Sequence, residues 1–62
     1  MKVHEVIVLL AEDGWEVVTM RGSHRQLKHP TKSGRVTVAG KRSDDLHPTT
    51  AGSILRQAGL RQ

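Results

Sequence analysis

The sequence contains no cysteine, phenylalanine or tyrosine, and it has a single tryptophan. Without cysteine, neither disulfides nor thiolate metal ligands can hold the fold, and this usage fits a reducing cytoplasm. The longest apolar run, residues 6–11, is far too short to span a bilayer. Because Glu12 and Asp13 follow that run directly, we interpret it as part of a buried helix and not as the core of a signal peptide.

The chain has few residues from which to build a site. With 62 residues and no internal repeat or linker, we expect a single domain over residues 1–62. A domain of this size buries only about 60% of the surface of its unfolded chain. It has no room for a deep enclosed cavity, so any site must lie on an open face or in a shallow groove.

Acidic residues are scarce and unevenly placed. The chain has 10 Lys+Arg against 6 Asp+Glu, a formal net charge of +4. Between residues 21 and 42 there is no acid, and the cations there are Arg21, Arg25, Lys28, Lys32, Arg35, Lys41 and Arg42. A segment of one sign in a small basic domain favours contact with a polyanion such as RNA or DNA. Charge alone leaves open a surface that is merely cationic.

Apolar residues at helical spacing predict two amphipathic helices. The first covers residues 2–13 and ends before Gly14. The second begins at Pro48, with His47 or a neighbour as its cap, and ends at Gly59 in a Schellman-type turn. Its apolar face is formed by Ala51, Ile54, Leu55 and Ala58.

Three strands are predicted between the helices, over residues 15–20, 23–29 and 35–38. Turn signals at Arg21-Gly22 and over residues 30–34 separate them, and residues 39–46 are expected to form a loop. The order α-β-β-β-α indicates an α+β fold. Its simplest form is a three-stranded antiparallel sheet with both helices on one face and the other face open to solvent or ligand.

Alternation along the second strand predicts which side chains project from the open face. Leu27 is the only strongly apolar residue of that strand, so it should face the helices, with Arg25 and His29 at the same parity near the sheet margin. The residues expected on the open face are His24, Gln26, Lys28, Arg35 and Thr37. A shift of one residue in register would reverse this assignment.

Gly22-Ser23-His24 opens a polar, basic run between two predicted strands. Such a run gains little from burial, so its residue types need another explanation. A tight glycine turn followed by a histidine among cations suits a site that handles phosphate. The four histidines match no standard zinc spacing, and we expect neither a metal nor another cofactor.

Several motifs together resemble the HicA-type toxins over nearly the whole chain. They are Glu12-Asp13-Gly14-Trp15, Arg21-Gly22-Ser23-His24, His29-Pro30, Val36-Thr37-Val38 and Ser53-Ile54-Leu55-Arg56-Gln57-Ala58-Gly59-Leu60. The resemblance implies a fold like that of a double-stranded-RNA-binding domain and a ribonuclease that degrades mRNA and arrests growth. It further implies neutralisation by a HicB-type antitoxin, and it maps the family's essential histidine onto His24.

Two segments depart from the family's pattern. Val38-Ala39-Gly40-Lys41 stands where many members have a proline and a further histidine, and Thr49-Thr50-Ala51 stands where many have Gly-Thr-Leu. Neither change touches His24. Both leave open the roles of Lys41, Arg42 and the loop over residues 39–46.

Breaking an RNA phosphodiester without metal needs a base for the 2′-hydroxyl, a cation for the charged phosphorane and an acid for the leaving 5′-oxygen. Histidine suits the acid or base role because imidazole titrates near neutral pH. We therefore expect His24 to act as acid or base. The cations expected to bind RNA or phosphate are Arg25, Lys28, Arg35 and Lys41.

Two other functions are open on the residues alone. A non-catalytic module could bind double-stranded RNA through its shape and phosphates, and a protein-interaction domain could use Val8 and Leu9 of the first helix. We expect Trp15 to be a core anchor and His29 to be a strand-end or loop residue. The expected partners are mRNA and a HicB-type antitoxin, with no membrane contact and a monomeric free chain.

Overall fold

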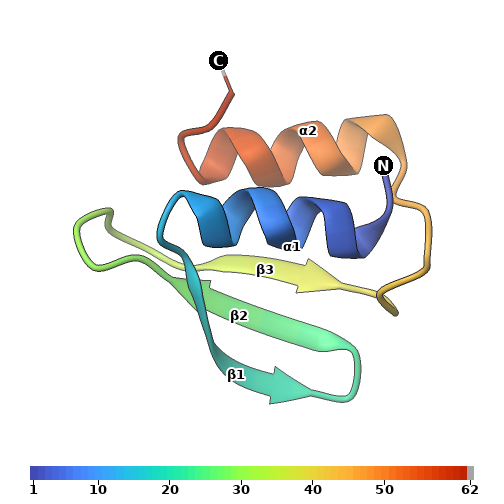
Figure 1. The fold of residues 1–62 in the computed structure, drawn as a ribbon, viewed down its shortest axis with the longest axis horizontal. Helices are drawn as coiled ribbons and strands as arrows, with labels where there is room; N and C mark the ends of the chain where they lie inside the picture. The colour runs from blue at the N-terminus through green and yellow to red at the C-terminus, as the bar shows by residue number, and fades with distance from the viewer. Residues whose placement is uncertain (62) are drawn as a thin grey trace.

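The computed structural model describes residues 1–61 and contains the five predicted elements in the predicted order (Figure 1). They are α1 (Val3–Glu12), β1 (Glu16–Arg21), β2 (His24–Lys28), β3 (Val36–Ala39) and α2 (Pro48–Gln57). Each boundary lies within about one residue of the predicted one, because glycines and apolar periodicity mark the element ends clearly. No helix in this part of the chain has the length and apolar character needed to cross a membrane.

The three strands form one antiparallel sheet in the order β1-β2-β3. The helices contact each other and β3, and Figure 1 shows them lying beyond the β3 side of the sheet. The strand β1 contacts chiefly β2, and all six of its residues are exposed. The predicted α+β fold, similar to that of a double-stranded-RNA-binding domain, is confirmed.

The hydrophobic core lies between the helices and the β2–β3 part of the sheet. Its members are Val3, Val6, Leu10, Trp15, Leu27, Val36, Val38, Ala51, Ile54, Leu55 and Ala58. Leu27 is 1% exposed and pairs with Val36. Because paired residues of an antiparallel ladder share a face, the alternate residues of β2 and β3 project from the opposite, open face, as predicted.

Trp15 is 3% exposed, which confirms it as a core anchor. Its indole Nε1 donates a hydrogen bond to Asp13 Oδ2 at 3.2 Å. The same carboxylate oxygen accepts from Lys32 Nζ at 2.6 Å, and Lys32 also donates to the Ala58 carbonyl at 2.9 Å. The hydrogen bond from Lys32 holds the pKa of Asp13 below its ordinary value of 3.8. This polar junction connects the end of α1, the β2–β3 loop and the end of α2.

The predicted caps of α2 are also confirmed. At its N-terminus, His47 Nδ1 accepts a hydrogen bond from the Thr49 N–H at 3.1 Å. At its C-terminus, Gly59 has φ +75°, and the Leu60 N–H donates to the Leu55 carbonyl at 2.9 Å, as in a Schellman motif. These caps fix the direction of α2 beside β3.

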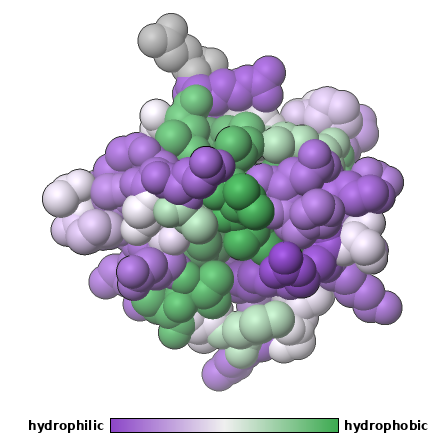
Figure 2. Space-filling model, viewed as in Figure 1, coloured by the Kyte–Doolittle hydropathy of each residue, from purple (hydrophilic) through white to green (hydrophobic). Residues whose placement is uncertain are grey.

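Some large hydrophobic residues lie outside the core and are exposed. Figure 2 shows it gathered in a strip across the middle of the molecule, between hydrophilic flanks. Val8 and Leu9 of α1 are 51% and 38% exposed. The exposed large apolar residues of β1 are Val17, Val18 and Met20.

Candidate functional site

A two-residue turn places His24 directly opposite Arg21. Gly22 has φ +55°, and Ser23 has a negative φ, as in a type II′ turn with glycine at the first central position. Arg21 and His24 are therefore partners at the end of the β1–β2 ladder. Their side chains share one face of the sheet because they are cross-strand neighbours.

A β-bulge in β1 determines that Arg21 projects from the same face of the sheet as His24. Val17 pairs with Leu27 and Thr19 pairs with Gln26, so Val18 is an extra residue on β1. Unbroken alternation from Val17, on the helix face, would place Arg21 on the helix face too. The bulge changes the parity and leaves Arg21 beside His24, in keeping with the tendency of bulges to redirect side chains near functional sites.

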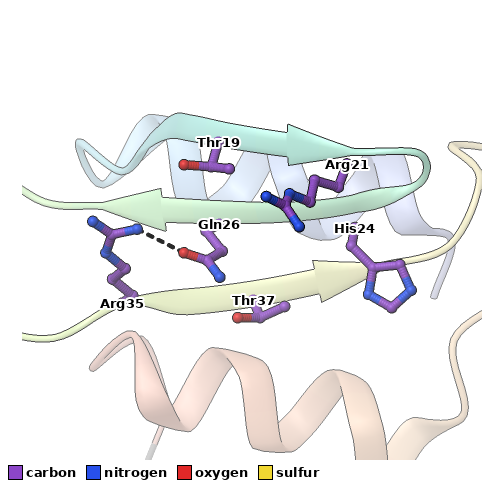
Figure 3. A pocket seen from close by; sticks show the side chains of 6 residues that line it. All are labelled: Thr19, Arg21, His24, Gln26, Arg35 and Thr37. Atoms are coloured by element: carbon purple, nitrogen blue, oxygen red, sulfur yellow. Dashed lines mark hydrogen bonds between the residues drawn. The ribbon is translucent and has the colours of Figure 1, made fainter.

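The open face of the sheet carries a shallow depression of about 360 Å³ (Figure 3). It is lined by Thr19, Arg21, His24, Gln26, Arg35 and Thr37. None of these described lining residues is acidic. Figure 3 shows Arg21 and His24 toward the β1–β2 turn and Arg35 toward the other end, with Gln26 between them. The Arg35 Nη1 donates to Gln26 Oε1 at 2.6 Å, which orients both side chains.

Chemically, the depression combines one exposed imidazole with two guanidinium groups. An exposed imidazole can accept or donate a proton, and the cations favour an anionic ligand. Arg21 is the closer of the two to His24 in the strand ladder, since the two residues are paired. Within residues 1–61, no three histidine or acidic side chains are close enough to form a metal site.

The predicted cations occupy different places. Arg35 lines the depression with His24. Lys28 is exposed at the end of β2, opposite Glu16, and Lys41 is exposed in the loop after β3. Neither of these two lysines lines the depression.

Arg25 does not reach the open face. It is 7% exposed and lies on the helix side of the sheet, opposite Val38. Its Nη1 donates to the Gly40 carbonyl at 2.8 Å and to the Ser23 carbonyl at 3.2 Å. Its guanidinium is buried and already bonded to two carbonyls that lie together just beyond the His24–Ala39 pair, so the structure does not favour the expected contact of Arg25 with phosphate.

His29 also lies away from the site, as predicted, just beyond the end of β2. Its Nε2 donates to the Asp13 carbonyl at 2.6 Å, and its Nδ1 accepts from the backbone N–H groups of Thr31 and Lys32 at 3.1 Å. The ring also meets Trp15 edge-on, with centroids 5.3 Å apart. His29 therefore organises the start of the β2–β3 loop.

Sequence reasoning missed Arg21 and Thr19 as members of the site. A signal for Arg21 was present, since Gly-Ser is one of the dipeptides that form two-residue hairpin turns. That turn alone would have paired Arg21 with His24. No comparable signal exists for Thr19, because the bulge at Val18 lies within a run of strand-forming residues.

The fold and the site together define a small α+β domain, folded like a double-stranded-RNA-binding domain, that displays an exposed histidine and two guanidinium groups on the open face of its sheet. The chain belongs to the HicA toxin family, since residues 3–60 match the family described as "HicA toxin of bacterial toxin-antitoxin". A comparison with curated proteins found no match. The resemblance drawn from the motifs is thus confirmed at the level of the family.

Proposed function

We propose that this protein is an endoribonuclease that cleaves mRNA, with His24 as its acid or base, and that a HicB-type antitoxin neutralises it. The observation that carries the proposal is the pairing of exposed His24 with Arg21 in a depression without acidic lining. Membership of a toxin family adds support. The cytoplasm is the proposed site of action, because mRNA is available there.

The proposed reaction is an in-line attack by the ribose 2′-oxygen on the adjacent phosphorus. The 2′-oxygen–phosphorus bond forms as the bond to the 5′-oxygen breaks, leaving a 2′,3′-cyclic phosphate and a 5′-hydroxyl. A base removes the 2′-hydroxyl proton, and an acid protonates the leaving oxygen. These two oxygens lie on opposite sides of the phosphorus, so His24 serves one of them and water exchanges the other proton.

In this proposal the cations contact different phosphates of the bound RNA. Arg21, the cross-strand partner of His24, is placed to stabilise the charge that develops on the phosphorane. Arg35, at the other end of the depression, would hold a neighbouring phosphate. Exposed Lys28 and Lys41 would contribute outer contacts, whereas buried Arg25 would contribute none.

The direct test compares wild-type protein with His24→Ala on a labelled mRNA fragment in EDTA. We expect the variant to lose cleavage by about 100-fold or more while keeping its circular dichroism spectrum and its RNA affinity. His4→Ala, a histidine change on α1 outside the depression, is the matched control and should cleave normally. Equal cleavage by His24→Ala would refute the proposal, and binding without cleavage by the wild type would establish a non-catalytic RNA-binding module.

The proposed antitoxin must prevent RNA from reaching His24. An acidic partner that covers the depression would do so, because the lining is cationic. Mixing the toxin with a HicB-type antitoxin should abolish cleavage in a purified assay. Unchanged cleavage in a stable complex would reject occlusion of the site.

A further inference from the structure

A second hollow, of about 560 Å³, lies between β3 and α2. Its lining residues are Thr37, Ala39, Leu46, Thr49, Thr50, Ser53, Ile54, and Gln57. We call it the β3–α2 groove. Figure 3 looks at the sheet from the side opposite α1 and shows α2 running alongside β3.

The groove and the His24 depression adjoin each other across β3. Thr37 lines both of them. Ala39, which lines the groove, is the cross-strand partner of His24. A ligand held at His24 can therefore extend into the groove without leaving the protein surface.

One stripe of α2 faces the groove. Thr50, Ser53, Ile54 and Gln57 follow the spacing i, i+3, i+4 and i+7, so they lie on the same side of the helix. Ile54 is 6% exposed and belongs to the core. The polar members of the stripe are hydroxyl and amide side chains.

The two hollows differ in chemistry. The His24 depression contains two guanidinium groups, whereas none of the described residues lining the groove is charged. Hydroxyls and an amide beside apolar Leu46 and Ile54 suit a neutral, partly aromatic group that offers hydrogen-bonding edges. In single-stranded RNA that group is a nucleoside, whose base is free to be splayed out and read at its edge. The volume lies within the roughly 300–1,000 Å³ typical of small-molecule sites.

We propose that the β3–α2 groove binds the nucleoside next to the scissile phosphate, and that Ser53 and Gln57 determine which base is preferred there. This inference rests on the proposed function. Because the depression is cationic and the groove is uncharged, the bound RNA would lie with its phosphates over Arg21 and Arg35 and with one base against α2. The competing occupant is a β-strand from a protein partner, because the edge of β3 facing away from β2 also borders the groove.

The first experiment maps cleavage positions on a mixed-sequence mRNA by sequencing the product ends. Ser53→Ala and Gln57→Ala should each weaken the preference for one base beside the cut by about tenfold. Arg56→Ala, an exposed change on α2 outside the groove, is the matched control and should keep the wild-type preference. An unchanged preference in both groove variants would overturn the inference while leaving His24 catalysis intact.

A second experiment does not depend on cleavage. Short single-stranded RNAs of adenine, cytosine or uracil alone are titrated into labelled His24→Ala protein and followed by amide NMR. We expect the preferred RNA to shift resonances of residues 49–57 as well as those around Arg21. Shifts confined to the depression, or shifts of residues 49–57 only on adding the antitoxin, would contradict the inference. Groove shifts from RNA without wild-type cleavage would support nucleoside binding in the groove but would reject the proposed nuclease and, with it, a role in choosing the cleavage site.

Discussion

At the scale of single residues, the pairing of His24 with Arg21 follows from a turn that permits little variation. Gly22 adopts a φ of +55°, which a residue with a Cβ adopts only at a cost. The turn closes directly on the pair, so the imidazole and the guanidinium project from neighbouring positions into the same depression. Arg35 lies farther along the depression and already donates to Gln26. Its contribution to the reacting phosphate should therefore be the smaller.

Substitutions of these two arginines test that ranking. Arg21→Ala should lower kcat by roughly 100-fold, the usual effect of removing one group that stabilises transition-state charge. Arg35→Ala should mainly raise KM, by about tenfold. Arg56→Ala serves as the control for loss of positive charge. Steady-state cleavage of a short RNA measures all three, and a larger kcat defect in Arg35→Ala than in Arg21→Ala would contradict the ranking.

Arg25 has a different role, which stability measurements can reveal. Its buried guanidinium bonds to the carbonyls of Ser23 and Gly40. Arg25→Met would leave those acceptors without their charged donor, so the free energy of unfolding should fall by about 2 kcal/mol. Urea unfolding gives this value, and gel-shift binding of RNA to the folded variant provides the comparison. If the Arg25→Met variant were as stable as the wild type but bound RNA more weakly, Arg25 would instead be a residue that contacts RNA.

At the scale of elements, the predicted helices and strands were correct where local signals decide them. Gly14 and Gly59 mark the helix ends, and Leu27 identifies the buried face of β2. The bulge at Val18 was not predictable, because Val17 and Val18 are both apolar and both suit a strand. It results from joining a two-residue turn at one end of β1 to a fixed register at the other.

The junction at Asp13 makes stability depend on pH in a defined direction. Lys32 lowers the pKa of Asp13 below 3.8 in the folded protein. The ionised carboxylate therefore stabilises the fold at pH values above the unfolded pKa, and this contribution is lost as the pH falls through the folded pKa. Asp13→Asn should have a lower Tm than the wild type at pH 7, with the difference shrinking toward about pH 2. Melting curves at both pH values check this, and an equal Tm difference at both would exclude an ionic contribution.

At the scale of the whole molecule, the His24 depression and much of the exposed apolar surface lie on different sides of the sheet, because Val17 and Met20 of β1 pair with the helix-facing residues Leu27 and Arg25. The His24 depression and the β3–α2 groove adjoin each other across β3. The exposed apolar residues lie largely on α1 and β1, where Val8 and Met20 are 51% and 58% exposed. The proposed binding of RNA at the depression would therefore leave most of this apolar surface free.

The sequence predicted the centre of the site better than its surroundings. His24, Gln26, Arg35 and Thr37 were placed on the open face by alternation alone, and the structure brings all of them to the depression. Alternation also placed Arg25 at the parity of Leu27, near the sheet margin, but its burial depends on backbone carbonyls of the turn and of the loop after β3, which no local pattern reports. The groove likewise depends on α2 returning to lie beside β3.

The most direct test of this account is the chemical nature of the new RNA ends, determined by mass spectrometry after cleavage in EDTA. The account predicts 2′,3′-cyclic phosphate and 5′-hydroxyl ends from the wild type, and intact RNA from His24→Ala. Products with 3′-hydroxyl and 5′-phosphate ends, or the same products from the His24→Ala variant, would contradict it.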